Sequence, residues 1–137
     1  WHWGESYALS IIHDLNNGTE GWCDWNVMVD ETGGPNHVSN FCFAPVVAIT
    51  QTGELRYMTS YYYIGHFSKF VRPGARRLAC SSTTEDLQAA AFENTDGTTA
   101  TVVMNAGGTP KPYFLWMNGR AAQLDLAPHA IMTVVSR

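Results

Sequence analysis

The chain has 137 residues, of which 45% are hydrophobic and 15% are charged, and its formal net charge at pH 7 is -4. This composition is typical of a globular protein, and the length suffices for one domain or two small units. The acidic balance argues against a nucleic-acid partner, and no apolar stretch approaches the roughly eighteen residues of a transmembrane segment.

The chain begins with a helical pattern. Four apolar residues recur at i, i+3, i+4 and i+7: Ala8, Ile11, Ile12 and Leu15. They predict an amphipathic helix that ends at Asn16-Asn17-Gly18. The next run, from Glu20 to about Val29, is so apolar and aromatic that it predicts a buried strand.

The middle of the chain predicts a long loop followed by a second helix. Residues 30–57 contain one short expected strand near Val46–Ile49. The second helix is expected from about Thr59 to Val71, and Pro73-Gly74 ends it. Its apolar face consists of Tyr63, Ile64, Phe67, Phe70 and Val71. The order of helix, buried strand, long loop and helix is typical of a βα architecture with a parallel sheet.

After Gly74 the pattern changes to short alternating runs separated by turn residues, which predicts antiparallel β-structure. The runs are 76–82, 87–94, 99–105, 112–117, 120–126 and 130–136. Asp96-Gly97 and Asn118-Gly119 are the strongest hairpin signals, because both pairs supply the positive φ of a type I′ turn. Alanines 89–91 and the valines at 102, 103, 134 and 135 suit the facing layers of a sandwich.

We expect the boundary between the two patterns near residues 73–76. The first part cannot cover the edges of its strand, and a complete (β/α)8 barrel needs about 250 residues. The expected fold is therefore α/β plus all-β, with the last βα units of a (β/α)8 TIM barrel followed by an antiparallel β-sandwich domain. Residues 1–73 would be the C-terminal segment of the barrel and residues 74–137 the sandwich. The other strands would lie upstream of Trp1, and the lack of an initiator methionine agrees with a chain cut from a longer one.

Cysteine and histidine indicate neither a disulfide framework nor a metal site. Three cysteines at positions 23, 42 and 80 are an odd number without a close pair, so buried thiols are expected, with a Cys23–Cys42 bridge as the alternative. The five histidines never fall at a metal-ligand spacing. We expect no cofactor and no metal, and no compartment is assigned.

The most informative segments are Gly21-Trp-Cys-Asp-Trp-Asn26 and Gly33-Gly-Pro-Asn-His-Val-Ser-Asn-Phe41. They combine flat aromatic side chains with amides and a carboxylate, the mixture that a sugar site needs for the apolar face and the hydroxyls of a pyranose. The alternative is a buried aromatic strand followed by a Gly-Pro turn, since strands favour aromatic residues.

These segments resemble glycoside hydrolase family 30, the group that contains glucosylceramidase and related microbial β-glycosidases. The matching motifs, in the same order and spacing, are Ser10-Ile-Ile12, the two segments above, Gly65-His-Phe-Ser-Lys-Phe70 and Pro73-Gly74. The resemblance is strong from about Trp3 to Arg77 and weaker through the β half. Together the motifs are highly specific, whereas each alone would be weak.

The resemblance implies a (β/α)8 barrel joined to a β-sandwich, hydrolysing β-glycosides with retention of configuration. Residues 20–27 would be the eighth barrel strand. Trp25 would be the aromatic wall of the subsite that holds the cleaved sugar, and Asn40 would line the same cleft. Trp25 also lies near the expected carboxyl end of its strand, where barrel enzymes place their chemistry. Asp24 and Asn26 would point to the opposite side, with Asp24 in a buried structural hydrogen bond.

One departure from the family is large. Retaining glycosidases use two carboxylates about 5 Å apart, a nucleophile and a general acid/base. In the family they end the seventh and fourth strands, so both would lie upstream of Trp1 and no catalytic residue is assigned here. Glu5 aligns with the helix after the nucleophile, and Glu20 precedes the eighth strand at the wrong face.

Other candidates have structural interpretations. His66 and Lys69 are expected to be solvated or capping residues of the second helix. Trp116 could be an exposed sugar platform, although its alternation with Phe114 favours a core or sheet-face position.

The leading hypothesis is therefore the C-terminal part of a retaining β-glycosidase, glucosylceramidase-like, acting on a β-glucoside or glycolipid. Its other partner would be the upstream barrel segment of the same protein. The alternatives are a non-catalytic carbohydrate-binding module and a structural β-sandwich fragment.

Overall fold

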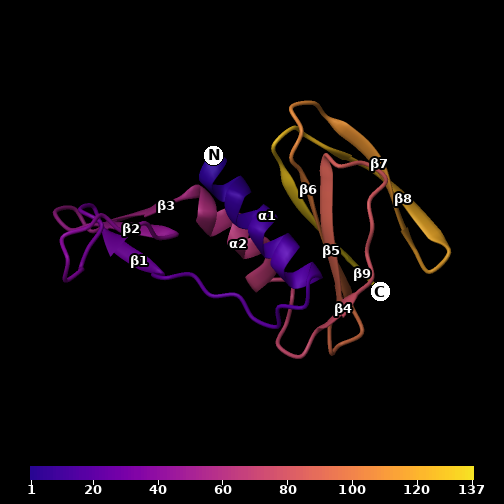
Figure 1. Cartoon of the computed structure of the whole chain (residues 1–137), viewed down its shortest axis with the longest axis horizontal. Coiled ribbons are helices and arrows are strands. Elements are labelled where there is room, and N and C mark those ends of the chain that lie inside the picture. Colours follow the sequence, from indigo (N-terminus) through magenta and orange to yellow (C-terminus); the bar gives the residue numbers. More distant parts are fainter.

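The computed structural model describes all of residues 1–137. In chain order the elements are α1 (His2–Asn16), β1 (Met28–Asp30), β2 (Val46–Ile49), β3 (Glu54–Tyr57), α2 (Thr59–Ser68), β4 (Arg76–Leu78), β5 (Leu87–Glu93), β6 (Thr99–Asn105), β7 (Lys111–Met117), β8 (Arg120–Leu126) and β9 (Ile131–Ser136). Figure 1 shows the two helices side by side between a small sheet, β1–β3, and a larger β region. The small sheet projects away from the rest of the chain.

The small sheet joins β1 and β2 in parallel and β2 and β3 antiparallel. The strand expected near Val46–Ile49 is confirmed as β2, whereas β3 was not predicted. All four residues of β3 are exposed, and its alternation of polar and apolar residues, Glu54-Leu-Arg-Tyr57, is only four residues long, so it is a weak strand signal in the sequence.

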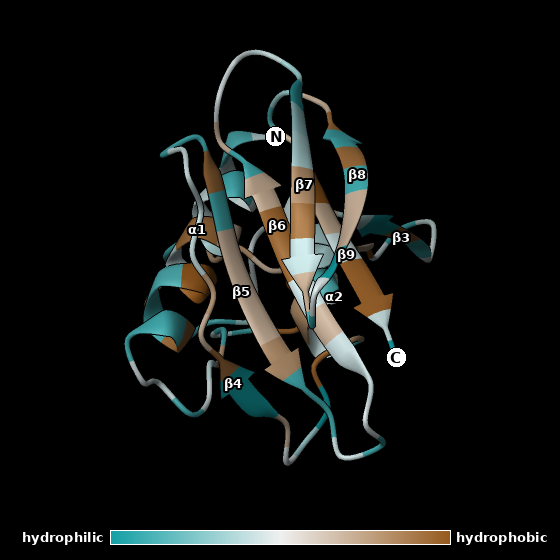
Figure 2. Cartoon of the chain, turned by 90° about the vertical axis from the view of Figure 1, so that its right-hand side faces the viewer, coloured by the Kyte–Doolittle hydropathy of each residue, from teal (hydrophilic) through white to brown (hydrophobic).

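The larger β region is a four-stranded antiparallel sheet, β4-β5-β6-β9, with the β7–β8 hairpin lying over one face. Figure 2 shows the hairpin on the near side of this sheet and the helices on the far side. The predicted runs 99–105 and 120–126 coincide with β6 and β8. The antiparallel prediction is confirmed for the whole second half.

One hydrophobic core links the helices to the sheet. Its nine buried members are Ala8, Ile11, Ile12, Tyr63, Phe67, Ala90, Phe92, Val102 and Met104. The period-2 alternation of β5 and β6 sends these sheet residues toward the helices. The opposite face of the sheet packs under the hairpin through a second cluster of Leu87, Val103 and Leu126. The core therefore continues across the predicted boundary at residues 73–76.

The two predicted helices are confirmed, with the second ending at Ser68 instead of Val71. Gly4 allows them to approach each other, because a Cβ there would lie 2.5 Å from Cδ2 of Tyr63. Tyr63 is 1% exposed, and its hydroxyl donates to the His129 carbonyl in the β8–β9 turn at 2.8 Å.

The strand predicted for residues 20–29 is observed in part. Only Met28–Asp30 pair in a ladder, and residues 20–27 have no strand partner within the chain. The side chains from Gly21 to Val27 nevertheless alternate strictly between exposed and half-buried. The segment is thus one-sided, not buried on both faces, because only the helices cover it.

The two hairpin signals have different outcomes. Asn118 and Gly119 both have positive φ, 50° and 74°, so the type I′ prediction is confirmed between β7 and β8. At the other turn only Gly97 has positive φ, and the loop between β5 and β6 is five residues long. There the Asp96 carboxylate accepts hydrogen bonds from the Thr98 N–H and hydroxyl at 2.9 and 2.6 Å, which fixes a longer turn.

All three cysteines are free, so the Cys23–Cys42 bridge is not formed. Cys23 is exposed, which contradicts the prediction of three buried thiols, because it lies on the open face of the 20–27 segment. Burial raises the pKa of the Cys80 thiol.

Candidate functional site

The segment from Gly21 to Val27 presents Trp25 to solvent. Its indole is 81% exposed and makes no hydrogen bond or ring contact within the chain. The neighbouring side chains Trp22, Asp24 and Asn26 turn the other way, toward α2, as the strand periodicity predicted. Trp25 takes no part in either hydrophobic cluster of the chain.

Contacts on the inner face hold this segment in place. The Tyr7 hydroxyl donates to Oδ1 of Asp24 at 3.2 Å, and the N–H of Trp25 donates to the same oxygen at 2.8 Å. Tyr7 and Trp22 also form an edge-to-face ring pair with centroids 5.7 Å apart. Burial, and then the Asp24 charge, raises the pKa of Tyr7, so its hydroxyl stays a donor. Asp24 therefore has the structural hydrogen-bonding role that the sequence analysis assigned to it.

Asp30 organises the loop that follows β1. Its Oδ1 accepts from the Thr32 hydroxyl at 2.6 Å, the Thr32 N–H at 2.8 Å and the Gly34 N–H at 2.9 Å. These hydrogen bonds, with the Thr32 hydroxyl as the largest contribution, lower the pKa of Asp30. The carboxylate is thus a structural acceptor at neutral pH through Oδ1.

Hydrogen bonds of a second side chain, a few residues later, also hold this loop. Asn36 donates through Nδ2 to the carbonyls of Gly33, at 3.3 Å, and of Asn40. Gly33 has φ +76°, and a Cβ there would lie 2.7 Å from the backbone nitrogen of Cys42, so only glycine allows this approach. The polar contacts fix the backbone of Asn40 and leave its side chain exposed, with Nδ2 3.6 Å from Sγ of Cys42.

An exposed aromatic cluster continues from Asn40. Phe41 and Phe43 meet edge to face with centroids 5.2 Å apart, and Phe43 stacks on Trp3 at 5.8 Å. All three side chains are more than half exposed. The cluster brings the first turn of α1 beside the loop after β1, a contact that the sequence analysis missed because it joins residues forty positions apart.

No hydrogen bond or ring contact joins the side chains of Trp25 and Asn40. A cleft of about 650 Å³ lies on the other side of the 20–27 segment, between Trp22, Asp24, Asn26 and the exposed side of α2. Oδ2 of Asp24 is buried without a hydrogen-bond partner. Trp25 does not line this cleft.

His66 differs from its predicted solvated role. Its Nδ1 lies 2.9 Å from the Thr133 hydroxyl of β9, and burial lowers the pKa of the imidazole. The helix face that carries His66 packs against the sheet, which the apolar pattern of α2 alone does not indicate. Lys69 is exposed, as expected, and its ammonium lies 5.3 Å from the ring centroid of Phe70.

The two glutamates near the start of the chain have structural surroundings. Glu5 lies on α1, and its Oε2 is 3.2 Å from Nδ1 of His129 in the β8–β9 turn. Glu20 is exposed, as predicted. Trp116 is 71% exposed on the outer face of the hairpin, so of the two predicted positions, core or sheet face, the structure shows the sheet face.

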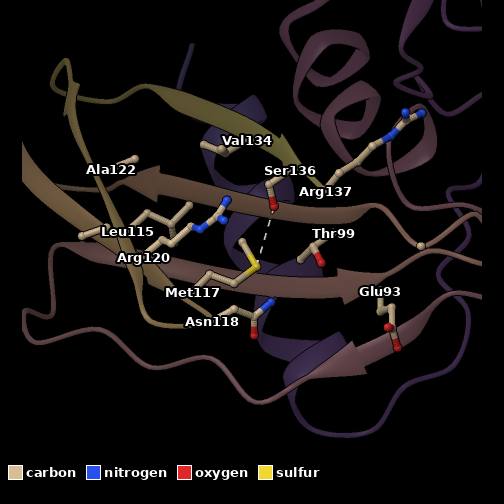
Figure 3. Close-up of a pocket in the computed structure, with 12 residues that line it drawn as sticks. Glu93, Thr99, Leu115, Met117, Asn118, Arg120, Ala122, Val134, Ser136 and Arg137 are labelled. Atoms are coloured by element: carbon tan, nitrogen blue, oxygen red, sulfur yellow. Dashed lines mark hydrogen bonds between the residues drawn. The ribbon is translucent and has the colours of Figure 1, made fainter.

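A second hollow, of about 640 Å³, lies between the turn end of the hairpin and the four-stranded sheet (Figure 3). The Ser136 hydroxyl donates to Sδ of Met117 across it at 3.7 Å. Its lining mixes arginines, a glutamate and apolar side chains from four strands, without a paired set of catalytic groups.

Two further observations concern ligands and membranes. No three or more histidine, cysteine, aspartate or glutamate side chains gather where they could hold a metal ion. Neither helix has the length and apolar character that crossing a bilayer requires.

Comparison with known proteins divides the chain into two matched parts. Residues 1–71 match the glycosyl hydrolase family 30 TIM-barrel domain, and residues 74–134 match the glycosyl hydrolase family 30 beta sandwich domain. The chain is 35% identical over 113 residues to the lysosomal acid glucosylceramidase of Mus musculus, covering 82% of this chain and 22% of that protein.

Two solved structures are similar over nearly the whole chain. SrfJ from Salmonella typhimurium superposes with a TM-score of 0.95 at 34% identity, covering 98% of this chain and 30% of that one. The endo-β1,6-glucanase BT3312 superposes with a TM-score of 0.83 at 30% identity, covering 95% and 30%. The chain therefore spans less than a third of the length of each of these relatives.

Proposed function

The chain belongs to glycosyl hydrolase family 30, as the end of its TIM barrel followed by its β-sandwich, and on that premise we propose that it is the C-terminal part of a retaining β-glycosidase. The proposed reaction is hydrolysis of a β-glucosidic bond, with a glucosylceramide-like glycolipid as substrate. The mouse relative, a glucosylceramidase 35% identical to this chain, supports this choice. We also propose residues 1–73 as barrel and 74–137 as sandwich.

The observation that carries the proposal is the exposed indole of Trp25. Within residues 1–137 Trp25 is 81% exposed, on the face of the 20–27 segment turned away from the helices, which in a (β/α)8 barrel is the face toward the barrel interior. An aromatic plane of this kind stacks on the apolar C–H face of a pyranose. In a (β/α)8 barrel the loops after the strands form the active-site face. The hydrogen-bonded loop after β1 would therefore place Asn40 on that face.

In the proposed mechanism, carboxylates upstream of this chain cleave the glycosidic bond. A retaining mechanism needs a nucleophile and an acid/base about 5 Å apart. Two carboxylates of this region have structural contacts through Oδ1: Asp24 accepts from Tyr7, and Asp30 accepts three hydrogen bonds from its own loop. Residues 1–73 would supply the stacking wall and an amide for the sugar hydroxyls. The nucleophile would form the glycosyl-enzyme bond as the aglycone leaves with a proton from the acid.

The test is Trp25→Ala in the full-length enzyme, with Trp25→Phe as the matched control, because phenylalanine keeps an aromatic plane at the same position. We expect Trp25→Ala to lower kcat/KM for an aryl β-glucoside about tenfold or more, equivalent to about 1.4 kcal/mol of transition-state stabilisation. Trp25→Phe should retain most of the wild-type kcat/KM.

Equal kinetics in Trp25→Ala and wild type would remove Trp25 from the site. The substrate is tested separately by comparing hydrolysis of glucosylceramide with that of a linear β-1,6-glucan. Faster turnover of the glucan would replace the proposed glycolipid substrate while leaving the glycosidase assignment intact.

A further inference from the structure

We propose that the outer face of the β7–β8 hairpin is a carbohydrate-binding site, with Phe114 and Trp116 as stacking platforms for a β-glucan chain. This site lies at the far end of the molecule from the β1–β3 sheet (Figure 1). It does not rest on the proposed glycosidase function, because a platform on the sandwich binds sugar whether or not the barrel cleaves it.

The alternation of β7 separates an anchoring face from an open face. Tyr113, Leu115 and Met117 are half-buried toward the four-stranded sheet, and the Tyr113 hydroxyl donates to Sδ of Met132 at 3.7 Å. Phe114 and Trp116 point outward and are 61% and 71% exposed. Because the inner face already anchors the hairpin, these two large rings are not needed for the packing of the sandwich.

The open face has the geometry of a sugar platform. Phe114 and Trp116 are two residues apart, so their rings lie about 7 Å apart along the strand and can each meet a different pyranose of one chain. The residue opposite Trp116 in the ladder is Ala121, whose methyl group leaves the indole face clear. Gln123 lies opposite Phe114, and Asp125 is two residues further along β8 on the same face, which supplies an amide and a carboxylate for hydroxyl groups.

A groove with a mixed polar and apolar lining borders the platform on the β7 side of the hairpin. Its volume is about 550 Å³, and both Phe114 and Trp116 line it. The opposite wall carries four hydroxyl side chains, Ser81, Ser82, Thr83 and Thr84. Aromatic planes next to a row of hydroxyl groups suit a ligand that has both apolar faces and many hydrogen-bonding groups, which is the chemistry of a polysaccharide.

Other occupants fit the face less well. Its outward residues Pro112, Phe114, Trp116, Ala121, Gln123 and Asp125 include no lysine or arginine, so it lacks the cations that hold phosphates. A stable protein interface buries about 800 Å² on each partner, far more than two side chains supply. The platform is also preorganised by seven ladder pairs and the Asn118-Gly119 turn, which lowers the entropic cost of binding a flexible chain.

The test measures binding of cellohexaose and of a soluble linear β-1,6-glucan to the full-length protein by titration calorimetry. We expect Trp116→Ala to weaken the binding of at least one of the two ligands about tenfold and Phe114→Ala to weaken it by a smaller factor, whereas Trp116→Tyr retains most of the affinity. Val135→Ala is the matched control, because Val135 is half-exposed on β9 of the same sandwich and does not lie on the hairpin.

Unchanged affinity in Trp116→Ala, or no binding of either glucan to wild type, would overturn the proposal. Analytical ultracentrifugation of wild type and Trp116→Ala tests whether a second copy of the protein binds this face. A self-association that the substitution abolishes would assign the face to that second copy instead of a glucan. Thermal unfolding of each variant checks that the hairpin still folds. Loss of glycosidase activity in Trp25→Ala leaves these outcomes unaffected, so the two proposals fail separately.

Discussion

Two regions of the molecule are stabilised in opposite ways: the loop region that joins the two helices, and the β-sandwich. Residues 17–58 contain strands of only three or four residues, and their buried hydrophobic side chains are Val29, Ala44 and Val46. The main strands of the sandwich are six or seven residues long and contribute to two hydrophobic clusters. The loop region is held instead by side-chain hydrogen bonds of Asp30 and Asn36.

This difference shows how a chain can keep aromatic side chains exposed without losing their position. Trp25, Phe41 and Phe43 are all more than half exposed, yet each follows or precedes a residue held by hydrogen bonds. A hydrophobic core would have buried the rings. Polar side chain-to-backbone bonds fix the backbone and leave the rings free to meet a ligand.

The contrast between the two regions predicts the greatest loss of stability for Ile12→Ala. Ile12 is 2% exposed in the nine-member cluster shared by helices and sheet, so its truncation should cost about 2–5 kcal/mol of unfolding free energy. Val29→Ala is the control, because Val29 is 3% exposed but belongs to neither cluster. Chemical denaturation of the full-length protein measures both, and equal losses would refute the contrast between the regions.

The next prediction compares two asparagines. Asn105 is fully buried and donates Nδ2 to the carbonyls of Thr109, Leu126 and Ala127 at 2.8, 3.2 and 3.0 Å. Asn105→Ala leaves these acceptors without partners and should cost about 1–3 kcal/mol of stability. Asn36→Ala removes a similar set of bonds from an exposed loop, where water replaces them.

Asn36→Ala should therefore leave the unfolding midpoint nearly unchanged but lower kcat/KM, since it releases the backbone of Asn40. Denaturation curves and steady-state kinetics on both variants check this pair. If Asn36→Ala destabilised the protein as much as Asn105→Ala, the loop would be part of the cooperative core.

The smallest effect concerns pH. Burial depresses the folded-state pKa of His66 below its ordinary 6.5, so the folded state binds this proton less well than the unfolded state. The contribution of neutral His66 to the free energy of unfolding is fully present above pH 6.5 and is lost as the pH falls through the folded-state pKa. His66→Gln should reduce the drop in Tm between pH 7.5 and acid pH. His37→Gln, at an exposed loop position, is the control and should behave as wild type.

Much of the fold followed from local patterns. The helices at His2–Asn16 and Thr59–Ser68 were predictable from apolar residues at helical spacing, and the β strands of the second half from alternation and turn residues. The Asn118-Gly119 turn was predictable because few residue pairs tolerate two positive φ angles. Trp25 and Asn40 remain predictions for the site, and the structure adds that both side chains are exposed.

Features that depend on distant partners were not predictable in this way. The 20–27 segment has strand periodicity but no ladder, because hydrogen-bonded pairing needs a neighbour that local sequence does not name. The packing of His66 against Thr133 and of Phe43 against Trp3 joins residues that are far apart in the chain. The exposure of Trp116 depended on which face of the hairpin met the sheet.

The order of helices and strands, the turn chemistry and the family motifs can be read from local sequence, because they depend on side-chain periodicity and backbone preferences within a few residues. Which aromatic faces stay in solvent cannot be read in this way, since burial depends on which distant elements pack together. The exposure of Trp25 and Trp116, on which the two binding proposals rest, is of this second kind.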